Sequence, residues 1–358
     1  MDEFESKDAM LSERAARLDK SNMAKVIENT PRQIENALSQ ELPSVPQGPF
    51  DEVIIAGMGG SALPAEVVIN SFADTLKIPI KVVRNYTIPK ADARSLVVVC
   101  SFSGNTEETL SVIESFPDDA ANVVVVTAGG RLAELATEKS YPLIKIPVWH
   151  EPQGFQPRSA IGYFVTYFVR LLDAINSIGG ATAQLKEVPA FLRVLTNVRS
   201  EAEDLAMWLE NQIPVVYTDE VHLTSIARIA KIKFNENSKR PAFFNALPEA
   251  NHNEMIGFMR KGLAQFGLLY LHDPDSHPRI RERYLVMKKV FAQDGLDHVA
   301  FREWEMPGRT KIQKTFAALM LADWCSYTLA LLDGFDPSPV PLVEKFKGVL
   351  SSFSGDEG

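Results

Sequence analysis

The sequence predicts an α/β protein in which two doubly wound domains each surround a parallel sheet. Runs of β-branched and aliphatic residues alternate with polar loops and helical stretches, as in sheets covered by helices on both faces. This alternation occurs twice, and proline-containing segments separate its parts. We therefore expect an N-terminal helical segment at 1–48, a first α/β domain at 49–150, linker helices at 151–210, and a second α/β domain with a C-terminal helical tail at 211–358.

The first domain is expected to have a flavodoxin-like arrangement, because its apolar runs are joined by helical stretches. Helices should begin near Ala62, Thr106 and Leu132, and the residues before about 42 also show helical spacing. The predicted strands are Val53–Ala56, Ile80–Val83, Leu96–Cys100, Val123–Thr127 and Leu143–Ile146.

The second half begins with a long apolar helix, predicted at Ile161–Ile175, and then repeats the strand–helix order. The stretch Tyr284–Phe291 fits either a strand or a helix. The other elements expected here are strands at Pro214–Tyr217 and Phe266–Leu271 and helices at Ser225–Glu236 and Lys311–Leu332.

The composition is that of an ordinary globular protein, with 46% hydrophobic and 23% charged residues among 358. The formal net charge of −9 argues against a general nucleic-acid or membrane surface. Cys100 and Cys325 lie in apolar stretches, which favours free core thiols in a reducing compartment. The charged N-terminal stretch is unlike a signal peptide, and we expect no membrane-spanning run, so the sequence favours a cytoplasmic protein.

Two polar loops follow strands of the first domain and precede helices. Gly57–Ala62 contains three glycines and Ser61, and Ser101–Thr106 contains three hydroxyl side chains and Gly104. Unpaired N–H groups at a helix N-terminus suit a phosphate dianion. Both loops are expected at the carboxyl edge of one sheet, where they would form one phosphate site. Alternatively, each serine is an ordinary helix N-cap.

In the second half, acid, base and amide side chains gather between residues 235 and 254. Asn235–Lys239 ends a predicted helix, and Leu247–Glu254 adds two more glutamates and a histidine. Such groups suit proton transfer between carbon atoms, which needs a desolvated carboxylate and a cation or donors for the oxyanion. The cluster therefore indicates acid–base chemistry.

The loops resemble the sugar isomerase (SIS) domain, which holds phosphosugars, and all the motifs together resemble the bifunctional phosphoglucose/phosphomannose isomerase family. That family belongs to the phosphoglucose isomerase superfamily and has two SIS domains. The resemblance covers roughly residues 50–350. Its segments are Gly57–Ala62, Ser101–Thr106, Gln156–Ala160, Asn235–Lys239, Leu247–Glu254, Ala322–Ala330 and Asp336–Val340.

The resemblance implies an aldose–ketose isomerase that converts glucose 6-phosphate, mannose 6-phosphate or both to fructose 6-phosphate through a cis-enediol. It implies that Glu236 moves the proton between C1 and C2 and that Arg158 stabilises the enediolate. His252, reaching a neighbouring subunit of a homodimer, and Lys347 would assist ring opening. The substrate phosphate would be held by Gly60, Ser61, Ser101, Ser103 and Thr106.

The resemblance implies no metal and no cofactor. The sequence departs from the family pattern before Glu344, where Val340–Val343 lacks a threonine and the nearest hydroxyl belongs to Ser338. This position is therefore left out of the predicted site.

Other functions fit parts of the sequence. A phosphosugar sensor without catalysis would use the loops alone, although Glu236, Arg158 and His252 argue against it. An NADP-dependent oxidoreductase would use the glycines of Gly57–Ala62 with Arg84, but it leaves Ser101–Thr106 unexplained.

Each proposed catalytic residue also has a structural interpretation. Glu236 and Lys347 could be solvated helix residues, and His252 could be a structural histidine. Arg158 could cap a carboxylate between the domains.

Overall fold

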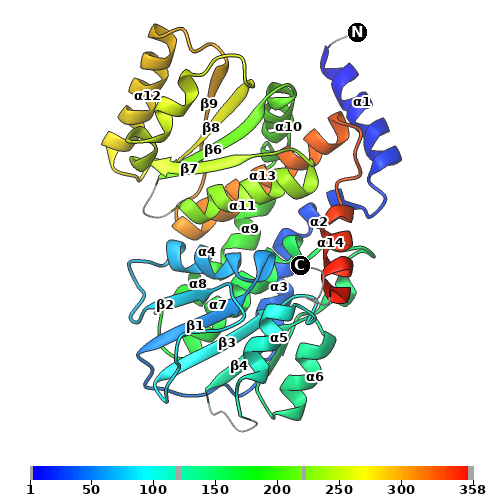
Figure 1. Cartoon of the computed structure of the whole chain (residues 1–358), viewed down its shortest axis with the longest axis vertical. Coiled ribbons are helices and arrows are strands. Elements are labelled where there is room, and N and C mark those ends of the chain that lie inside the picture. The colour runs from blue at the N-terminus through cyan, green and yellow to red at the C-terminus, as the bar shows by residue number, and fades with distance from the viewer. Residues whose placement is uncertain (1–2, 118–121, 220–222, 354–358) are drawn as a thin grey trace.

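The computed structural model describes residues 3–117, 122–219 and 223–353 (Figure 1). Within them, both sheets consist of parallel strands. The first sheet has the order β2-β1-β3-β4-β5, and the second has the order β7-β6-β8-β9. The second order repeats the first without its last strand, so the expected α/β architecture with two parallel sheets is confirmed.

The strands of the first sheet lie close to their predicted positions. They are β1 (Glu52–Gly57), β2 (Ile80–Val83), β3 (Ser95–Ser101), β4 (Val123–Thr127) and β5 (Leu143–Lys145). The second sheet contains β6 (Ile213–Asp219), β7 (Phe243–Leu247), β8 (Phe266–His272) and β9 (Val299–Glu305). The sequence did not predict β7 and β9, which are the edge strands of this sheet. Edge strands bury less surface, and β9 carries charged residues within its run.

Helices precede, connect and follow these strands. They are α1 (Glu3–Leu18), α2 (Met23–Glu28), α3 (Thr30–Ser39), α4 (Leu63–Ser71), α5 (Glu107–Glu114), α6 (Gly130–Glu138), α7 (Ile161–Ala174), α8 (Ala181–Lys186), α9 (Val188–Val194), α10 (Val198–Leu209), α11 (Thr224–Asn237), α12 (Pro278–Gln293), α13 (Lys311–Leu332) and α14 (Pro341–Ser352). The ambiguous stretch Tyr284–Phe291 thus belongs to a helix, α12. The short 3₁₀ helices are η1 (Gly59–Ser61), η2 (Val148–His150), η3 (Pro157–Ser159), η4 (Glu249–Asn251) and η5 (Glu254–Met259).

Alternate strand residues face two helical layers, as the two-residue period of a strand requires. Val53 and Ile55 of β1 belong to a large core that also contains α4, α7, α11 and α13, the helices between the two sheets. Ile54 faces the outer layer with α5 and α6. Because the large core includes residues of both sheets, such as Val216 of β6, the two halves pack as one body.

α13 is the longest helix of this core. It has 22 residues and an 18-residue window of mean hydropathy 1.4, so its length and composition would allow it to cross a membrane. The expectation that no run reaches this length was therefore wrong for α13. However, 94% of that window is buried inside the protein, which is the position of a core helix.

α14 differs from the other long helices because none of its residues is buried. Leu342, Phe346 and Val349 are 80%, 63% and 58% exposed. These residues lie on one face at helical spacing, so α14 presents an apolar stripe to solvent.

Candidate active site

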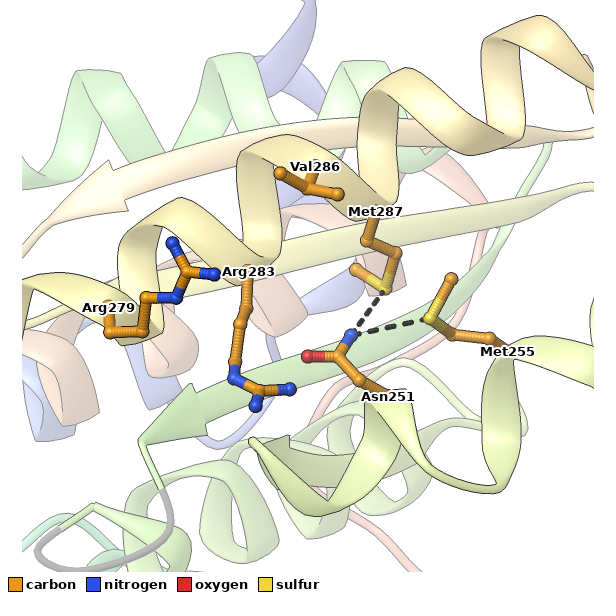
Figure 2. A pocket seen from close by; sticks show the side chains of 6 residues that line it. All are labelled: Asn251, Met255, Arg279, Arg283, Val286 and Met287. Carbon is orange, nitrogen blue, oxygen red and sulfur yellow. Dashed lines mark hydrogen bonds between the residues drawn. The ribbon is translucent and has the colours of Figure 1, made fainter.

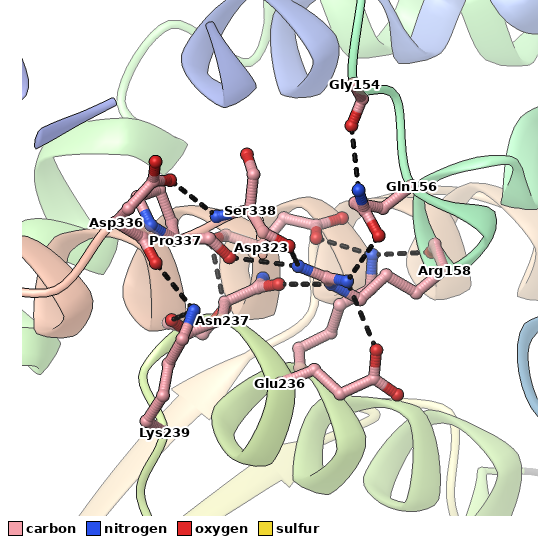
Figure 3. Close-up of polar contacts among 12 residues, drawn as sticks. Gly154, Gln156, Arg158, Glu236, Asn237, Lys239, Asp323, Asp336, Pro337 and Ser338 are labelled. Atoms are coloured by element: carbon pink, nitrogen blue, oxygen red, sulfur yellow. Dashed lines mark hydrogen bonds and ion pairs between the residues drawn. The ribbon is translucent and has the colours of Figure 1, made fainter. Parts of the chain in front are cut away.

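The side chain of Arg158 lies at the junction of segments that are far apart in the sequence (Figure 3). It belongs to η3 and only 4% of the side chain is exposed. Its Nη2 donates to the carbonyl oxygens of Pro337, at 2.9 Å, and Ser338, at 2.7 Å. Its Nη1 donates to Glu236 Oε2 at 3.2 Å and to Gln156 Oε1 at 3.5 Å. With Nε bonded to Asn237 Oδ1 at 2.6 Å, five acceptors surround the five N–H groups.

Glu236 and Asn237 lie in the last turn of α11, where Asn237 holds Arg158 in place and Glu236 faces solvent. The Asn237 amide is buried and connects Arg158 to α13. Its Oδ1 accepts from Arg158, and its Nδ2 donates to Ser326 Oγ of α13 at 2.9 Å. The Glu236 carboxylate is 36% exposed and contacts Arg158 from the solvent side. The helix end therefore holds one side chain as a fixed support and leaves the neighbouring carboxylate accessible to a ligand.

A buried lysine supports Arg158 from behind. Lys233 lies one turn before Asn237 on α11, and its Nζ donates to the Arg158 carbonyl oxygen at 2.9 Å. The same ammonium forms an ion pair of 2.6 Å with Asp323 of α13. Burial lowers the pKa of the Arg158 guanidinium, and the negative charges of Glu236 and Asp323 oppose that change. These charges favour a cationic arginine at a site that is almost closed to water.

The loop Gly57–Ala62 packs directly on Arg158. A Cβ atom at Gly60 would lie 3.0 Å from the Arg158 Cα and 3.1 Å from the Pro157 carbonyl oxygen, so a larger residue would fit only if the backbone there moved by a few tenths of an ångström. The next residue, Ser61, is buried, and its Oγ accepts a 2.9 Å hydrogen bond from the backbone N–H of Phe102. The structure therefore brings the two hydroxyl-bearing loops together beside Arg158.

In the loop Ser101–Thr106, the serine hydroxyls mainly form hydrogen bonds within the loop itself. Ser101 Oγ accepts from the backbone N–H of Gly104 at 3.1 Å and lies 2.8 Å from Thr106 Oγ1. Ser103 is exposed, and its Oγ accepts from the Asn105 N–H. The N-cap of α5 is Thr106 and that of α4 is Ala62, and neither makes a side-chain cap hydrogen bond, so the serines of the two loops are not the N-caps of these helices.

Donors for an anion remain at this loop. α5 begins at Glu107, and the first N–H groups of a helix have no acceptor within it. Beside the loop lies a cavity of about 410 Å³, which Ser103 and Gly129 line together with residues 151–155. An anionic group held by these N–H groups and by Ser103 would face this space.

Two predicted residues do not reach Arg158 within one chain. His252 is exposed at the end of η4, beyond the carboxyl end of β7. It lies next to Asn251, which lines a separate cavity of about 240 Å³ between η4 and α12 (Figure 2). Lys347 is exposed on α14 and makes no hydrogen bond or ion pair with any described residue.

Sequence reasoning missed several residues that hold Arg158. Asn237 and Gln156 belong to motifs that were recognised, but their neighbours received the functional roles. Ser338 was left out because its alignment was uncertain, yet its carbonyl oxygen is an Arg158 acceptor and the residue is only 2% exposed. A motif indicates which residue matters, whereas only the structure shows which of its atoms makes the contact.

The arrangement has the parts that proton transfer near a phosphate requires. An accessible carboxylate lies against a buried cation, and helix N–H groups with hydroxyls lie close by. Arg84, the cation expected for an NADP phosphate, instead forms a 2.7 Å ion pair with Glu66. Among the described residues, no group of three or more His, Cys, Asp or Glu side chains is placed to hold a metal ion.

Comparison with known proteins gives matches to enzymes that act on phosphorylated sugars. Residues 198–350 match the bacterial phospho-glucose isomerase C-terminal SIS domain. The chain is 31% identical to the bifunctional phosphoglucose/phosphomannose isomerase of Caldicellulosiruptor bescii, over 92% of this chain and 99% of the relative. It is also 34% identical to the D-glucosamine-6-phosphate 4-epimerase of Sulfolobus acidocaldarius, over 65% of this chain and 72% of that relative.

Solved structures show the same fold. The C-terminal domain of glucosamine-fructose-6-phosphate aminotransferase from Francisella tularensis superposes with a TM-score of 0.68 at 15% identity. The match covers 89% of this chain and 98% of that one.

Proposed function

Because the chain belongs to the bifunctional phosphoglucose/phosphomannose isomerase family, we propose that it interconverts glucose 6-phosphate and mannose 6-phosphate with fructose 6-phosphate. The observation that carries the proposal is the contact between the accessible Glu236 carboxylate and the buried Arg158 guanidinium, 3.2 Å apart. It lies beside two loops suited to a phosphate group. These features support an enzyme that moves a proton within a phosphorylated sugar.

In the proposed reaction, Glu236 is the base. It takes the proton from C2 of the open-chain aldose phosphate while the C1 carbonyl oxygen takes up a proton from solvent, which gives a cis-enediol. Glu236 then returns its proton to C1 while the C2 hydroxyl releases its proton to solvent and becomes a carbonyl, which gives the ketose. Arg158 stabilises the negative charge that develops on the oxygen atoms, because its charge is fixed before the reaction begins. Glucose and mannose give the same enediol, since C2 is planar in it.

The phosphate is proposed to bind at the N-terminus of α5. Ser103, Thr106 and the first N–H groups of that helix would donate to it. Gly60, Ser61 and Ser101 would act by setting the loop shape, since their contacts in the structure are within the protein.

Ring opening is proposed to depend on a homodimer in which His252 enters the neighbouring site. The surface around His252 supports this arrangement, because Ile256, Met259 and Leu263 are 70%, 61% and 69% exposed. Apolar side chains gathered at one surface mark interaction sites. The bare stripe of α14, which carries Lys347, is a second such surface, and a helix of 12 residues is marginal without a partner. A cytoplasmic location is in keeping with the two buried free thiols.

Enzyme assays test the proposal directly. Glucose 6-phosphate and mannose 6-phosphate would be supplied separately, with EDTA present, and the formation of fructose 6-phosphate would be followed. Glu236→Gln should remove most turnover while it leaves fructose 6-phosphate binding nearly intact. Glu282→Gln is the matched control, because Glu282 is an exposed helix residue whose one ion pair among the described residues is with Arg279. Half or more of the wild-type activity in E236Q would exclude Glu236 as the base.

Mixed dimers test the shared site. E236Q and H252N chains should each be nearly inactive alone, but a mixed dimer has one site with both wild-type groups. Random pairing gives mixed dimers in half of the population, so activity should return to about a quarter of the wild-type value. If His252 acts within its own chain, mixing will restore nothing.

The epimerase relative defines a second candidate. Its 34% identity favours testing glucosamine 6-phosphate as a substrate in parallel. Turnover of glucosamine 6-phosphate without turnover of glucose or mannose 6-phosphate would replace the proposed reaction. Tight binding of fructose 6-phosphate with no turnover of any substrate would favour a sensor.

A further inference from the structure

Lys239 has a backbone conformation that a lysine seldom adopts. α11 ends at Asn237, and Lys239 follows two residues later with φ of +58°. Glycine is strongly preferred at this position after a helix, because a Cβ atom is unfavourable in the left-handed region. A lysine here therefore needs a favourable side-chain contact to offset its backbone conformation.

The side chain makes such a contact at the candidate active site (Figure 3). The Lys239 ammonium donates to the carbonyl oxygen of Asn237 at 3.0 Å and to that of Asp336 at 2.6 Å. The Asp336 carboxylate in turn accepts from the Ser338 N–H at 2.9 Å. One ammonium thus joins the end of α11 to the loop 336–338. Both segments supply acceptors to Arg158.

We propose that Lys239 is a positioning residue, which holds the loop 336–338 against α11 and thereby orients the Arg158 guanidinium toward Glu236. The catalytic part of this inference rests on the proposed function, whereas the effect on the loop does not. Lys239 itself need not touch the substrate, because its ammonium is already bonded to two backbone carbonyls.

The charges around Lys239 give the contact a pH dependence. Arg158 of η3, Glu236 of α11 and Asp336 of the loop are the charged groups that act on it. Burial, together with the positive charge of Arg158, lowers the pKa of Lys239 to about 8. A neutral amine forms weaker hydrogen bonds to carbonyl oxygens than an ammonium does. The hold on the loop should therefore weaken as the pH rises above 8.

Three variants separate the side chain from the backbone. Lys239→Gly removes the ammonium and suits the backbone, and Lys239→Arg keeps a positive charge at every accessible pH. Ser140→Gly is the control, since Ser140 has φ of +57° and its side chain makes no hydrogen bond among the described residues. Each protein would be assayed with fructose 6-phosphate between pH 6.5 and 9.5. Hydrogen exchange of the peptide around 336–338 would be measured in parallel.

We expect K239G to lower kcat by about tenfold to a hundredfold, as for other displaced catalytic groups, with KM changed by less than about twofold. Its 336–338 peptide should exchange faster, whereas S140G should match the wild type in both measurements. Wild-type kcat/KM should fall above pH 8, and K239R should move that fall to higher pH.

The inference would be overturned by unchanged exchange of the 336–338 peptide in K239G, or by half or more of the wild-type kcat in that variant. An alkaline fall that stays near pH 8 in K239R would also contradict it. A wild-type protein without turnover would refute the proposed function instead, and hydrogen exchange alone would then decide whether Lys239 holds the loop.

Discussion

Replacing Arg158 by lysine tests whether the junction depends on the shape of a guanidinium or only on its charge. The guanidinium has five N–H groups and five acceptors, four of which are the oxygens of Asn237, Glu236, Pro337 and Ser338. A lysine ammonium has three N–H groups at a single point. At least two of the five acceptors must therefore lose their donor in R158K.

The size of the effect follows from burial. A buried polar atom left without a partner costs about 1–3 kcal/mol, so each of the buried acceptors on Asn237, Pro337 and Ser338 that loses its donor should lower the free energy of unfolding by about that amount. Small domains are stable by only about 5–15 kcal/mol, so this loss is readily measured. The matched control is Arg131→Lys, because Arg131 is 43% exposed and pairs with Glu134 and Glu138 at the surface. That change should cost less than about 1 kcal/mol.

Urea unfolding at one protein concentration gives both free energies, and kcat with fructose 6-phosphate gives the catalytic effect. We expect R158K to lose about 10²-fold in kcat, because the positive charge would be displaced from the oxygen atoms that it is proposed to stabilise. If R158K unfolds within about 1 kcal/mol of the wild type, the five-acceptor argument is refuted. Normal stability together with lost turnover would assign Arg158 to catalysis alone.

Three further changes test separate parts of the site. Gly104→Ala should destabilise the protein far more than Gly59→Ala. A Cβ at Gly104 would lie 1.7 Å from the Gly129 carbonyl oxygen, whereas a Cβ at Gly59 would meet open space. The melting temperatures of the two variants would be compared. Ser61→Ala should cost about 0.5–1.5 kcal/mol and raise KM, because the partly buried Phe102 N–H loses its acceptor; equal KM values would contradict this. Although neutral Lys239 should hold the loop less firmly, loss of its buried charge should make the free energy of unfolding rise between pH 8 and 10, and this rise should be smaller in Lys239→Met. The folded protein releases the Lys239 proton near pH 8, whereas the unfolded chain keeps it until about 10.4, so the unfolded state binds more protons in this window.

The first sheet was predictable because its central strands are buried on both faces. β3 and β4 therefore appear as uninterrupted apolar runs, and their ends could be placed within one residue. The edge strands β7 and β9 have no such signal, because their exposed positions accept asparagine, arginine and glutamate. α12 was ambiguous for a related reason, since only its inner face is buried.

The site was predictable only where residues lie in recognisable motifs. Glu236, Arg158 and the two loops could be named, but the pairing of Arg158 with Glu236 joins positions 78 residues apart. The contact with the Ser338 carbonyl joins positions 180 residues apart and uses a backbone atom, which leaves no trace in residue type. His252 and Lys347 could be named from the family resemblance, whereas their places on exposed surfaces required the structure.

The position of Arg158 explains why this site needs both sheets. The loops proposed to bind phosphate follow strands of the first sheet, and Glu236 lies in the last turn of a helix that follows a strand of the second. A phosphosugar that binds both must therefore span the junction between the two halves, where any relative movement would separate the phosphate from the base. Gly60 fixes the first loop against the Arg158 backbone, while Asn237 and Ser338 fix the guanidinium against the second half. Arg158 is thus attached to both halves at once, so the residue proposed to stabilise the enediolate also maintains the distance across which the substrate must lie.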